Sequence, residues 1–185
     1  MSLTPSNMLP LGTKAPDFNL VDSLSEETLH LGAIKGDKGT VIMFICNHCP
    51  FVVHVNPEIV RVAKEYQAKG LGFIAISSND IVNYPQDAPH FMQKVAAEVG
   101  YSFPYLYDET QEVAKAYDAA CTPDFYLFDT DLALVYRGQL DDSRPGNGIS
   151  LTGADLRTAI DALLSGKENT QVQKPSIGCN IKWKQ

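Results

Sequence analysis

Two of the four cysteines are separated by two residues, in the run Cys46-Asn47-His48-Cys49-Pro50. The thiolate form of cysteine is the nucleophile in disulfide exchange and is also the form that binds metal ions. A C-x-x-C pair between a buried strand and a helix indicates thiol–disulfide chemistry. Two weaker interpretations stay open: a metal-binding pair, and inert buried thiols at the end of a strand.

The position of this pair favours a reactive thiolate. Pro50 suits the first position of a helix, so the preceding residues lie where the helix begins. A thiol at that place meets unpaired backbone N–H groups and the positive end of the helix dipole, and both stabilise a negative charge. His48, when protonated, adds to the same effect.

The surrounding sequence predicts the elements that position the pair. A polar turn separates two short apolar runs within residues 11–30, which indicates a hairpin. Continuous apolar runs indicate strands buried on both faces. Strands are expected at 40–45, 71–77, 124–129 and 133–137, and helices at 50–69, 89–99, 108–117 and 152–165. This order predicts a mixed sheet covered by helices on both faces, with the first two strands parallel and the last two antiparallel.

Two of the helix starts carry capping signals. Thr152 is expected to cap the last helix, with Asp155 at the capping-box position. Asp108 is expected to begin the short helix, with Gln111 three residues later completing a second capping box.

Size and charge restrict the class of protein. The chain has 185 residues and a formal net charge of −7, with no basic tract, which disfavours nucleic acid and anionic membrane surfaces as partners. We expect one domain over residues 1–167, including an N-terminal extension, and a C-terminal tail at 168–185 packed on or near it. The N-terminal residues show no secretory pattern, so a cytoplasmic protein is expected. Four cysteines are too few for a disulfide-built scaffold.

Several segments together resemble the thioredoxin superfamily over about residues 12–166. Within it, the chain looks like the peroxiredoxin-like proteins near the TlpA-type thiol–disulfide oxidoreductases and the alkyl hydroperoxide reductase (AhpC/TSA) family. The segments that carry the resemblance are 12–20, 46–50, Thr122-Pro123, 138–146 and, in the tail, 175–179. The resemblance implies an α/β fold, a thioredoxin-like three-layer α/β/α sandwich with a mixed central sheet and an N-terminal β-hairpin. It also implies a cis Thr122–Pro123 bond whose proline faces the nucleophile.

The resemblance also suggests which cysteine attacks. In thioredoxins a proline follows the first cysteine by eight residues, and here Pro57 follows Cys49 by eight. This register favours Cys49 as the nucleophile over Cys46, for which Pro57 would come eleven residues later. Val52 then stands where thioredoxins have the second cysteine. The resolving thiol must therefore come from elsewhere. The candidates, in order, are Cys46, Cys121 and the tail residue Cys179.

Two rival functions remain. Peroxiredoxins place a threonine three residues before the peroxidatic cysteine, but here that position holds Cys46, so peroxidase activity is the runner-up. Arg137 or Arg144 would have to supply the arginine that stabilises a peroxidatic thiolate. The second rival is a non-catalytic metal-binding or redox-sensing module. Its ligands would be Cys46, Cys49, Cys121 and His48.

The sequence thus predicts a thiol–disulfide oxidoreductase that needs no cofactor and no resident metal. The expected catalytic residues are Cys49, Cys46, Cys121, Thr122 and Pro123. The expected substrate is a protein or small-molecule disulfide, or a peroxide if the protein is an antioxidant peroxidase. A thioredoxin or glutathione system would restore the dithiol, and the oligomeric state is left open.

Overall fold

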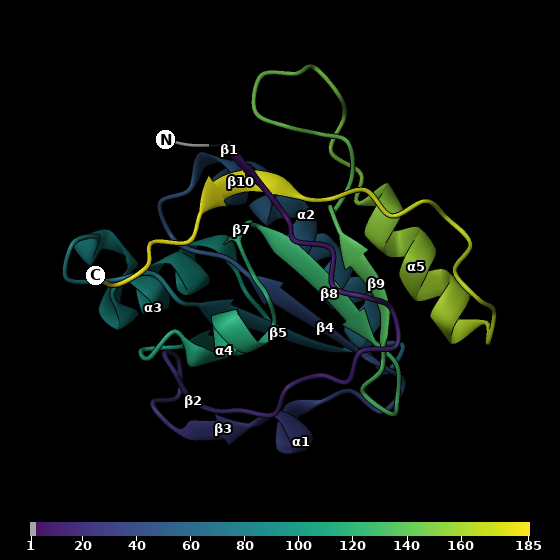
Figure 1. The fold of residues 1–185 in the computed structure, drawn as a ribbon, viewed down its shortest axis with the longest axis horizontal. Coiled ribbons are helices and arrows are strands. Elements are labelled where there is room, and N and C mark those ends of the chain that lie inside the picture. The colour runs from purple at the N-terminus through teal and green to yellow at the C-terminus, as the bar shows by residue number, and fades with distance from the viewer. Residues whose placement is uncertain (1–2) are drawn as a thin grey trace.

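The fold is built on a seven-stranded mixed sheet (Figure 1). The structure is a computed structural model that describes residues 3–185. The strand order is β3-β2-β6-β5-β4-β8-β9. The strands are β2 (Asn19–Asp22), β3 (Thr28–His30), β4 (Thr40–Phe44), β5 (Gly72–Ser77), β6 (Tyr105–Tyr107), β8 (Asp124–Phe128) and β9 (Leu134–Gly138). β4 and β5 are parallel, and β8 and β9 are antiparallel, as the sequence predicts.

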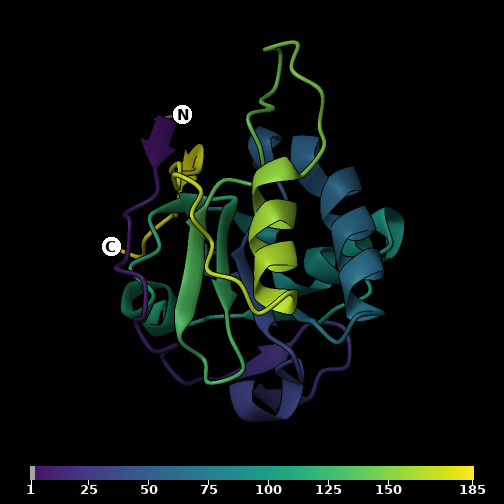
Figure 2. The same ribbon diagram turned by 90° about the vertical axis from the view of Figure 1, so that its right-hand side faces the viewer.

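Helices cover both faces of this sheet. Its helices are α1 (Leu31–Ile34), α2 (Pro50–Gln67), α3 (Pro89–Val99), α4 (Glu112–Ala116) and α5 (Ala154–Leu164), with a short 3₁₀ turn η1 (Pro85–Asp87). One hydrophobic core joins α2, α3 and α5 to one face, and a second joins α1 and α4 to the other. Figure 2 shows α2 and α5 on the same face. All five residues of β4 are buried, and its four apolar residues, 41–44, alternate between the two cores.

Strand β6 is absent from the sequence prediction. It pairs in parallel with β5 and antiparallel with β2, so it connects the N-terminal hairpin to the rest of the sheet. Its three residues directly follow Pro104 and are too few to show a periodic pattern.

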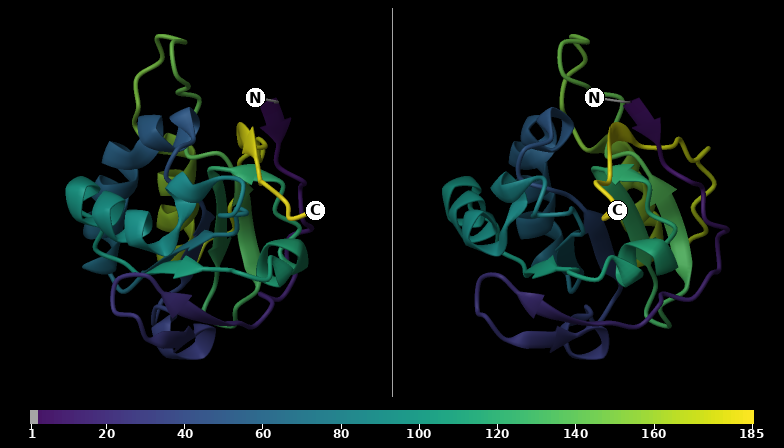
Figure 3. Two further views of the ribbon diagram at one scale, coloured as in Figure 1. Left: turned by 90° about the vertical axis from the view of Figure 1, so that its left-hand side faces the viewer. Right: turned by 60° about the vertical axis from the view of Figure 1, so that its left-hand side comes forward.

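A second, smaller sheet holds the C-terminal segment. Its order is β1-β10-β7, formed by β1 (Leu3–Pro5), β10 (Ile177–Asn180) and β7 (Cys121–Thr122). β10 runs antiparallel to both neighbours, and Figures 1 and 3 show β1 and β10 side by side. This sheet brings the tail directly against the residue that precedes Pro123.

Both predicted capping boxes are wrong. The N-cap of α5 is Gly153, with φ of 66°, and the carboxylate of Asp141 accepts hydrogen bonds from the N–H groups of Thr152 and Gly153, each at 2.6 Å. The N-cap of α4 is Gln111, whose side chain makes no capping bond, while Asp108 accepts from the Ala114 N–H at 2.9 Å. The carboxylate that accepts hydrogen bonds at the start of α5 belongs to a separate loop. Residue spacing near the helix start therefore does not reveal it.

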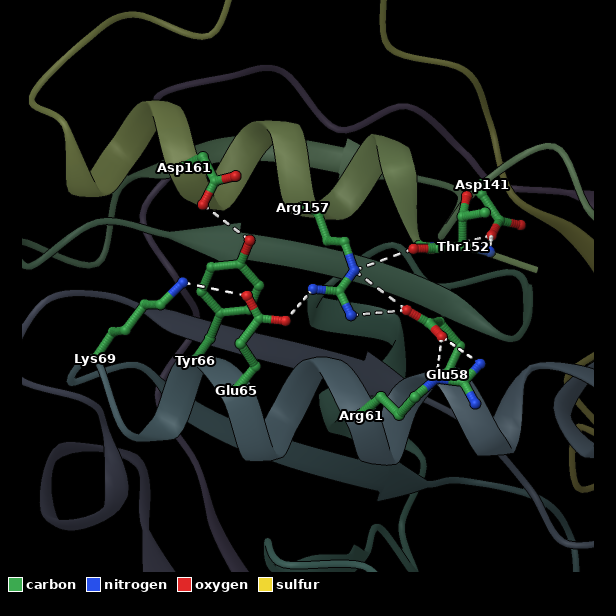
Figure 4. A network of polar contacts seen from close by, with 10 residues as sticks. Glu58, Arg61, Glu65, Tyr66, Lys69, Asp141, Thr152, Arg157 and Asp161 are labelled. Atoms are coloured by element: carbon green, nitrogen blue, oxygen red, sulfur yellow. Dashed lines mark hydrogen bonds and ion pairs between the residues drawn. The ribbon is translucent and has the colours of Figure 1, made fainter. Parts of the chain in front are cut away.

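A polar network fixes α2 against α5 (Figure 4). Glu58 is 3% exposed and forms ion pairs with Arg61 and with Arg157, the latter at 2.8 Å. The hydroxyl of Tyr66 donates to Asp161 at 2.8 Å. These contacts hold the helix that begins directly after Cys49. No helix within residues 3–185 is long and apolar enough to cross a membrane.

Candidate active site

Three sulfur atoms and Thr122 meet at the N-terminus of α2. Cys49 is the N-cap residue and is fully buried. Its Sγ lies 2.8 Å from the Sγ of Cys179 and 3.3 Å from the carbonyl oxygen of Thr122. The Sγ of Cys46 lies 3.4 Å from the hydroxyl of Thr122. Thr122 therefore contacts both cysteines of the C-x-x-C pair, and its bond to Pro123 is cis, as expected.

The surroundings of Cys49 favour its thiolate. The pKa of Cys49 is lowered to about 5, chiefly by a hydrogen bond from Cys46. Cys179 and the Val52 N–H lower it further, and burial opposes the shift. The Val52 N–H acts from the first turn of α2, which is where a helix stabilises an anion. These effects together favour the thiolate of Cys49.

The other three thiols stay protonated. The pKa of Cys46 is raised well above its usual range by its hydrogen bond with Cys49, by burial and by the charge of Asp87. Burial and the neighbouring Cys49 raise the pKa of Cys179 to about 12. Burial, followed by the charge of Asp124, raises the pKa of Cys121. Cys49 is thus the one of the four thiols whose surroundings favour the thiolate.

Asp87 anchors the segment between the two cysteines. It is fully buried, and it accepts hydrogen bonds from the Asn47 N–H at 2.9 Å and from the Asn79 amide at 2.8 Å. Its other contact is His48, whose Nδ1 lies 2.7 Å away. This role could not be predicted from local spacing, because Asp87 lies on η1, outside the C-x-x-C motif and far from it along the chain.

The possible metal ligands differ from the predicted set. Among the residues that the structure describes, one group of this kind is present: donor atoms of Cys46, His48 and Asp87 lie within 4.8 Å of one another. Cys49 and Cys121 are not in it. Both oxygens of Asp87 already accept hydrogen bonds, and one of them lies at hydrogen-bond distance from His48. The carboxylate of Asp87 is thus occupied by hydrogen bonds within the protein, so the group is not arranged as an open metal site.

Cys121 faces away from the C-x-x-C pair. It is the neighbour of Thr122 on β7, and successive residues of a strand project to opposite faces. The Thr122 hydroxyl contacts Cys46, while the sulfur of Cys121 lies 3.9 Å from the carbonyl oxygen of Pro123.

The two arginines considered for a peroxidatic site are engaged elsewhere. Arg137 is fully buried, pairs with Asp124 at 3.2 Å and donates to the Tyr126 hydroxyl at 2.9 Å. Arg144 donates to the carbonyl oxygens of Asp141 and Ser143, at 2.6 and 2.7 Å.

Solved structures of low sequence identity share this fold. The thioredoxin domain of a thiol-disulfide oxidoreductase from Bacteroides vulgatus is 18% identical, with a TM-score of 0.66 over 85% of this chain and 99% of that one. The peroxidoxin BcpB from Mycobacterium tuberculosis is 18% identical, with a TM-score of 0.64 over 85% of this chain and 98% of that one. The fold is therefore thioredoxin-like, as predicted.

Sequence comparison gives the family. An uncharacterized conserved protein from Geobacillus kaustophilus is 62% identical, with a TM-score of 0.98 over 100% of this chain and 97% of that one. A search of the curated proteins found no significant match. The model of the AhpC/TSA family matches residues 11–137. That match covers more than half of the chain and includes both cysteines of the C-x-x-C pair, and so the chain belongs to the AhpC/TSA family.

Proposed function

We propose that the protein is a thiol–disulfide oxidoreductase in which the thiolate of Cys49 attacks a disulfide. The observation that carries this proposal is a buried N-cap cysteine, with a pKa lowered to about 5, packed against two further thiols and Thr122. A low pKa supplies the nucleophile at neutral pH, and a second thiol nearby lets the exchange go to completion.

The reaction proceeds in two exchange steps. The Cys49 thiolate attacks one sulfur of a substrate R–S–S–R′, forms a mixed disulfide with R and releases R′ as a thiolate, which takes up a proton. A second protein thiol then attacks the Cys49 sulfur and releases R. The protein loses two thiols and gains one disulfide, and the substrate is reduced to two thiols. A thioredoxin or glutathione system then restores the dithiol.

The geometry supports disulfide exchange better than peroxide reduction. A low-pKa thiolate reacts with both classes of oxidant. The hydrogen bonds of Arg137 and Arg144, however, go to groups other than Cys49, and the Thr122 hydroxyl contacts Cys46. The expected arginine and threonine contacts of a peroxidatic site are thus missing from the described surroundings of Cys49.

A single-turnover experiment tests the proposal. The reduced protein is mixed with oxidised glutathione, quenched in acid, and assayed for released thiol and for protein mass. We expect the wild type to release two glutathione molecules and Cys49→Ser to release none. The same measurement with hydrogen peroxide is the comparison. Fast consumption of peroxide without reaction with glutathione disulfide would contradict the proposal and favour a peroxidase.

A further inference from the structure

We propose that Cys179, on β10 of the C-terminal tail, is the thiol that resolves the mixed disulfide on Cys49. This inference rests on the proposed function. The two sulfurs are 2.8 Å apart although they are separated by 130 positions in the chain. A disulfide bond is about 2.05 Å long, so the sulfurs have to approach by less than about 1 Å. The resolving role expected for Cys46 or Cys121 passes to this residue.

The backbone of β10 is built to bring Cys179 to this place. Cys179 is the register partner of Thr122, whose carbonyl oxygen also contacts Cys49. The preceding residue, Gly178, lies so close to β7 that a Cβ atom there would be 1.9 Å from the carbonyl oxygen of Thr122. Only glycine permits β10 to approach β7 this closely, and the close approach places Cys179 beside Cys49.

The tail is anchored on both sides of Cys179. Before it, the N–H of Ser176 donates to the Ser6 hydroxyl at 2.8 Å, and the Ser6 N–H donates back to Ser176 at 2.9 Å. After it, the N–H of Lys182 donates to the Asn79 side chain at 2.9 Å, and its carbonyl accepts from the Asp80 N–H at 2.8 Å. These bonds place the sulfur of Cys179 against Cys49 in the reduced protein.

Neighbouring charges favour Cys179 over Cys46 as the second nucleophile. The Cys49 thiolate opposes ionisation of both thiols, and this effect disappears once Cys49 is in a mixed disulfide. Asp87 continues to oppose ionisation of Cys46. The ammonium group of Lys182 instead favours ionisation of Cys179. Burial still opposes ionisation of both thiols, but of the two Cys179 ionises more readily and is the better second nucleophile.

The resolving step exchanges the mixed disulfide for one within the protein. The Cys179 thiolate attacks the Cys49 sulfur, the bond from Cys49 to the substrate sulfur breaks, and the substrate thiolate takes up the proton that Cys179 lost. Cys49 is fully buried and Cys179 is 2% exposed. A substrate therefore reaches the Cys49 sulfur only when the chain that covers it opens. The segment 177–180 must therefore move aside for the first exchange and return for the second.

Disulfide mapping of single cysteine variants tests this assignment. Wild type, Cys179→Ser, Cys46→Ser and Cys121→Ser react with oxidised glutathione, are quenched in acid, alkylated and analysed by mass spectrometry. We expect a Cys49–Cys179 disulfide in the wild type. In Cys179→Ser we expect the mixed disulfide on Cys49 to accumulate, with release of the second glutathione slowed about tenfold or more, because an intramolecular thiol acts at millimolar or higher effective concentration. Cys121→Ser is the matched comparison, since it removes a buried thiol that faces away from Cys46.

The outcomes separate the two proposals. A Cys46–Cys49 or Cys49–Cys121 disulfide in the wild type, or resolution at the wild-type rate in Cys179→Ser, would overturn the role of Cys179 and leave the oxidoreductase intact. Absence of any glutathione adduct on Cys49 in Cys179→Ser, with the wild type also unreactive, would instead overturn the proposed function. Cys179→Ala, compared with Cys179→Ser by thermal melting and by mapping, separates loss of the nucleophile from loss of folding.

Discussion

Replacing Cys46 by alanine should raise the pKa of Cys49. The hydrogen bond from Cys46 is the largest of the effects that lower this pKa to about 5. A hydrogen bond to a charged group contributes about 1.5–3 kcal/mol, and one pKa unit corresponds to about 1.4 kcal/mol. We therefore expect the pKa of Cys49 to rise by about 1–2 units in Cys46→Ala. The fraction of Cys49 ionised at pH 7 would fall from about 99% to between about 90% and 50%.

The pKa can be measured by following the ultraviolet absorbance of the thiolate as the pH is raised. Alkylation of Cys49, followed by mass spectrometry at each pH, assigns the transition to that residue. Cys46→Ser is the matched control, because a hydroxyl in the same position can still donate a hydrogen bond. It should keep most of the wild-type shift.

Two results would refute this reasoning. A Cys46→Ala protein whose transition stays near pH 5 would show that the helix N-terminus and Cys179 are sufficient to stabilise the thiolate. A Cys46→Ser protein that titrates like Cys46→Ala would show that the sulfur acts through packing and not as a donor.

Three further changes test the supporting structure. Gly178→Ala should lower the free energy of unfolding by about 1–3 kcal/mol, because its Cβ would overlap the Thr122 carbonyl. It should also prevent the Cys49–Cys179 disulfide from forming. Denaturant unfolding and disulfide mapping measure the two effects, with Gly32→Ala as control. Burial raises the pKa of Asp124 to about 6. Between pH 3.8 and about 6 the native state therefore binds more protons than the unfolded state. The free energy of unfolding should fall as the pH rises through that window. Asp124→Asn should remove this slope, and an unchanged slope in pH-dependent unfolding would count against the assignment. Glu58→Gln should cost about 1–3 kcal/mol, because it leaves Arg61 and Arg157 without their shared carboxylate, and should lower the melting temperature.

Much of the central sheet could be predicted from the sequence because its signals are local. β4 is buried on both faces, so it appears as an unbroken apolar run, and Pro50 marks the start of α2 directly after it. That pair of signals also placed Cys49 at the helix N-terminus. The cis bond before Pro123 followed from resemblance and not from any local pattern.

The parts that escaped prediction depend on contacts between distant segments. β10 is four residues long and gains its structure from β1 and β7. No spacing rule connects Cys179 to Cys49, so Cys179 ranked third among the candidate resolving thiols. Asp87 was missed for the same reason, since its partners Asn47 and His48 lie on another loop.

The long separation between Cys49 and Cys179 has a consequence for oxidative folding. Cys46 and Cys49 are three residues apart, whereas closing the loop from Cys49 to Cys179 spans 130 positions. For a flexible chain this difference amounts to about 3 kcal/mol of loop-closure entropy in favour of the local pair. An unfolded chain exposed to oxidant would thus cross-link Cys46 to Cys49 first, and docking of β10 would have to precede oxidation for the long-range disulfide to form. Refolding yields under oxidising conditions should therefore depend on whether oxidant is added before or after the chain has folded.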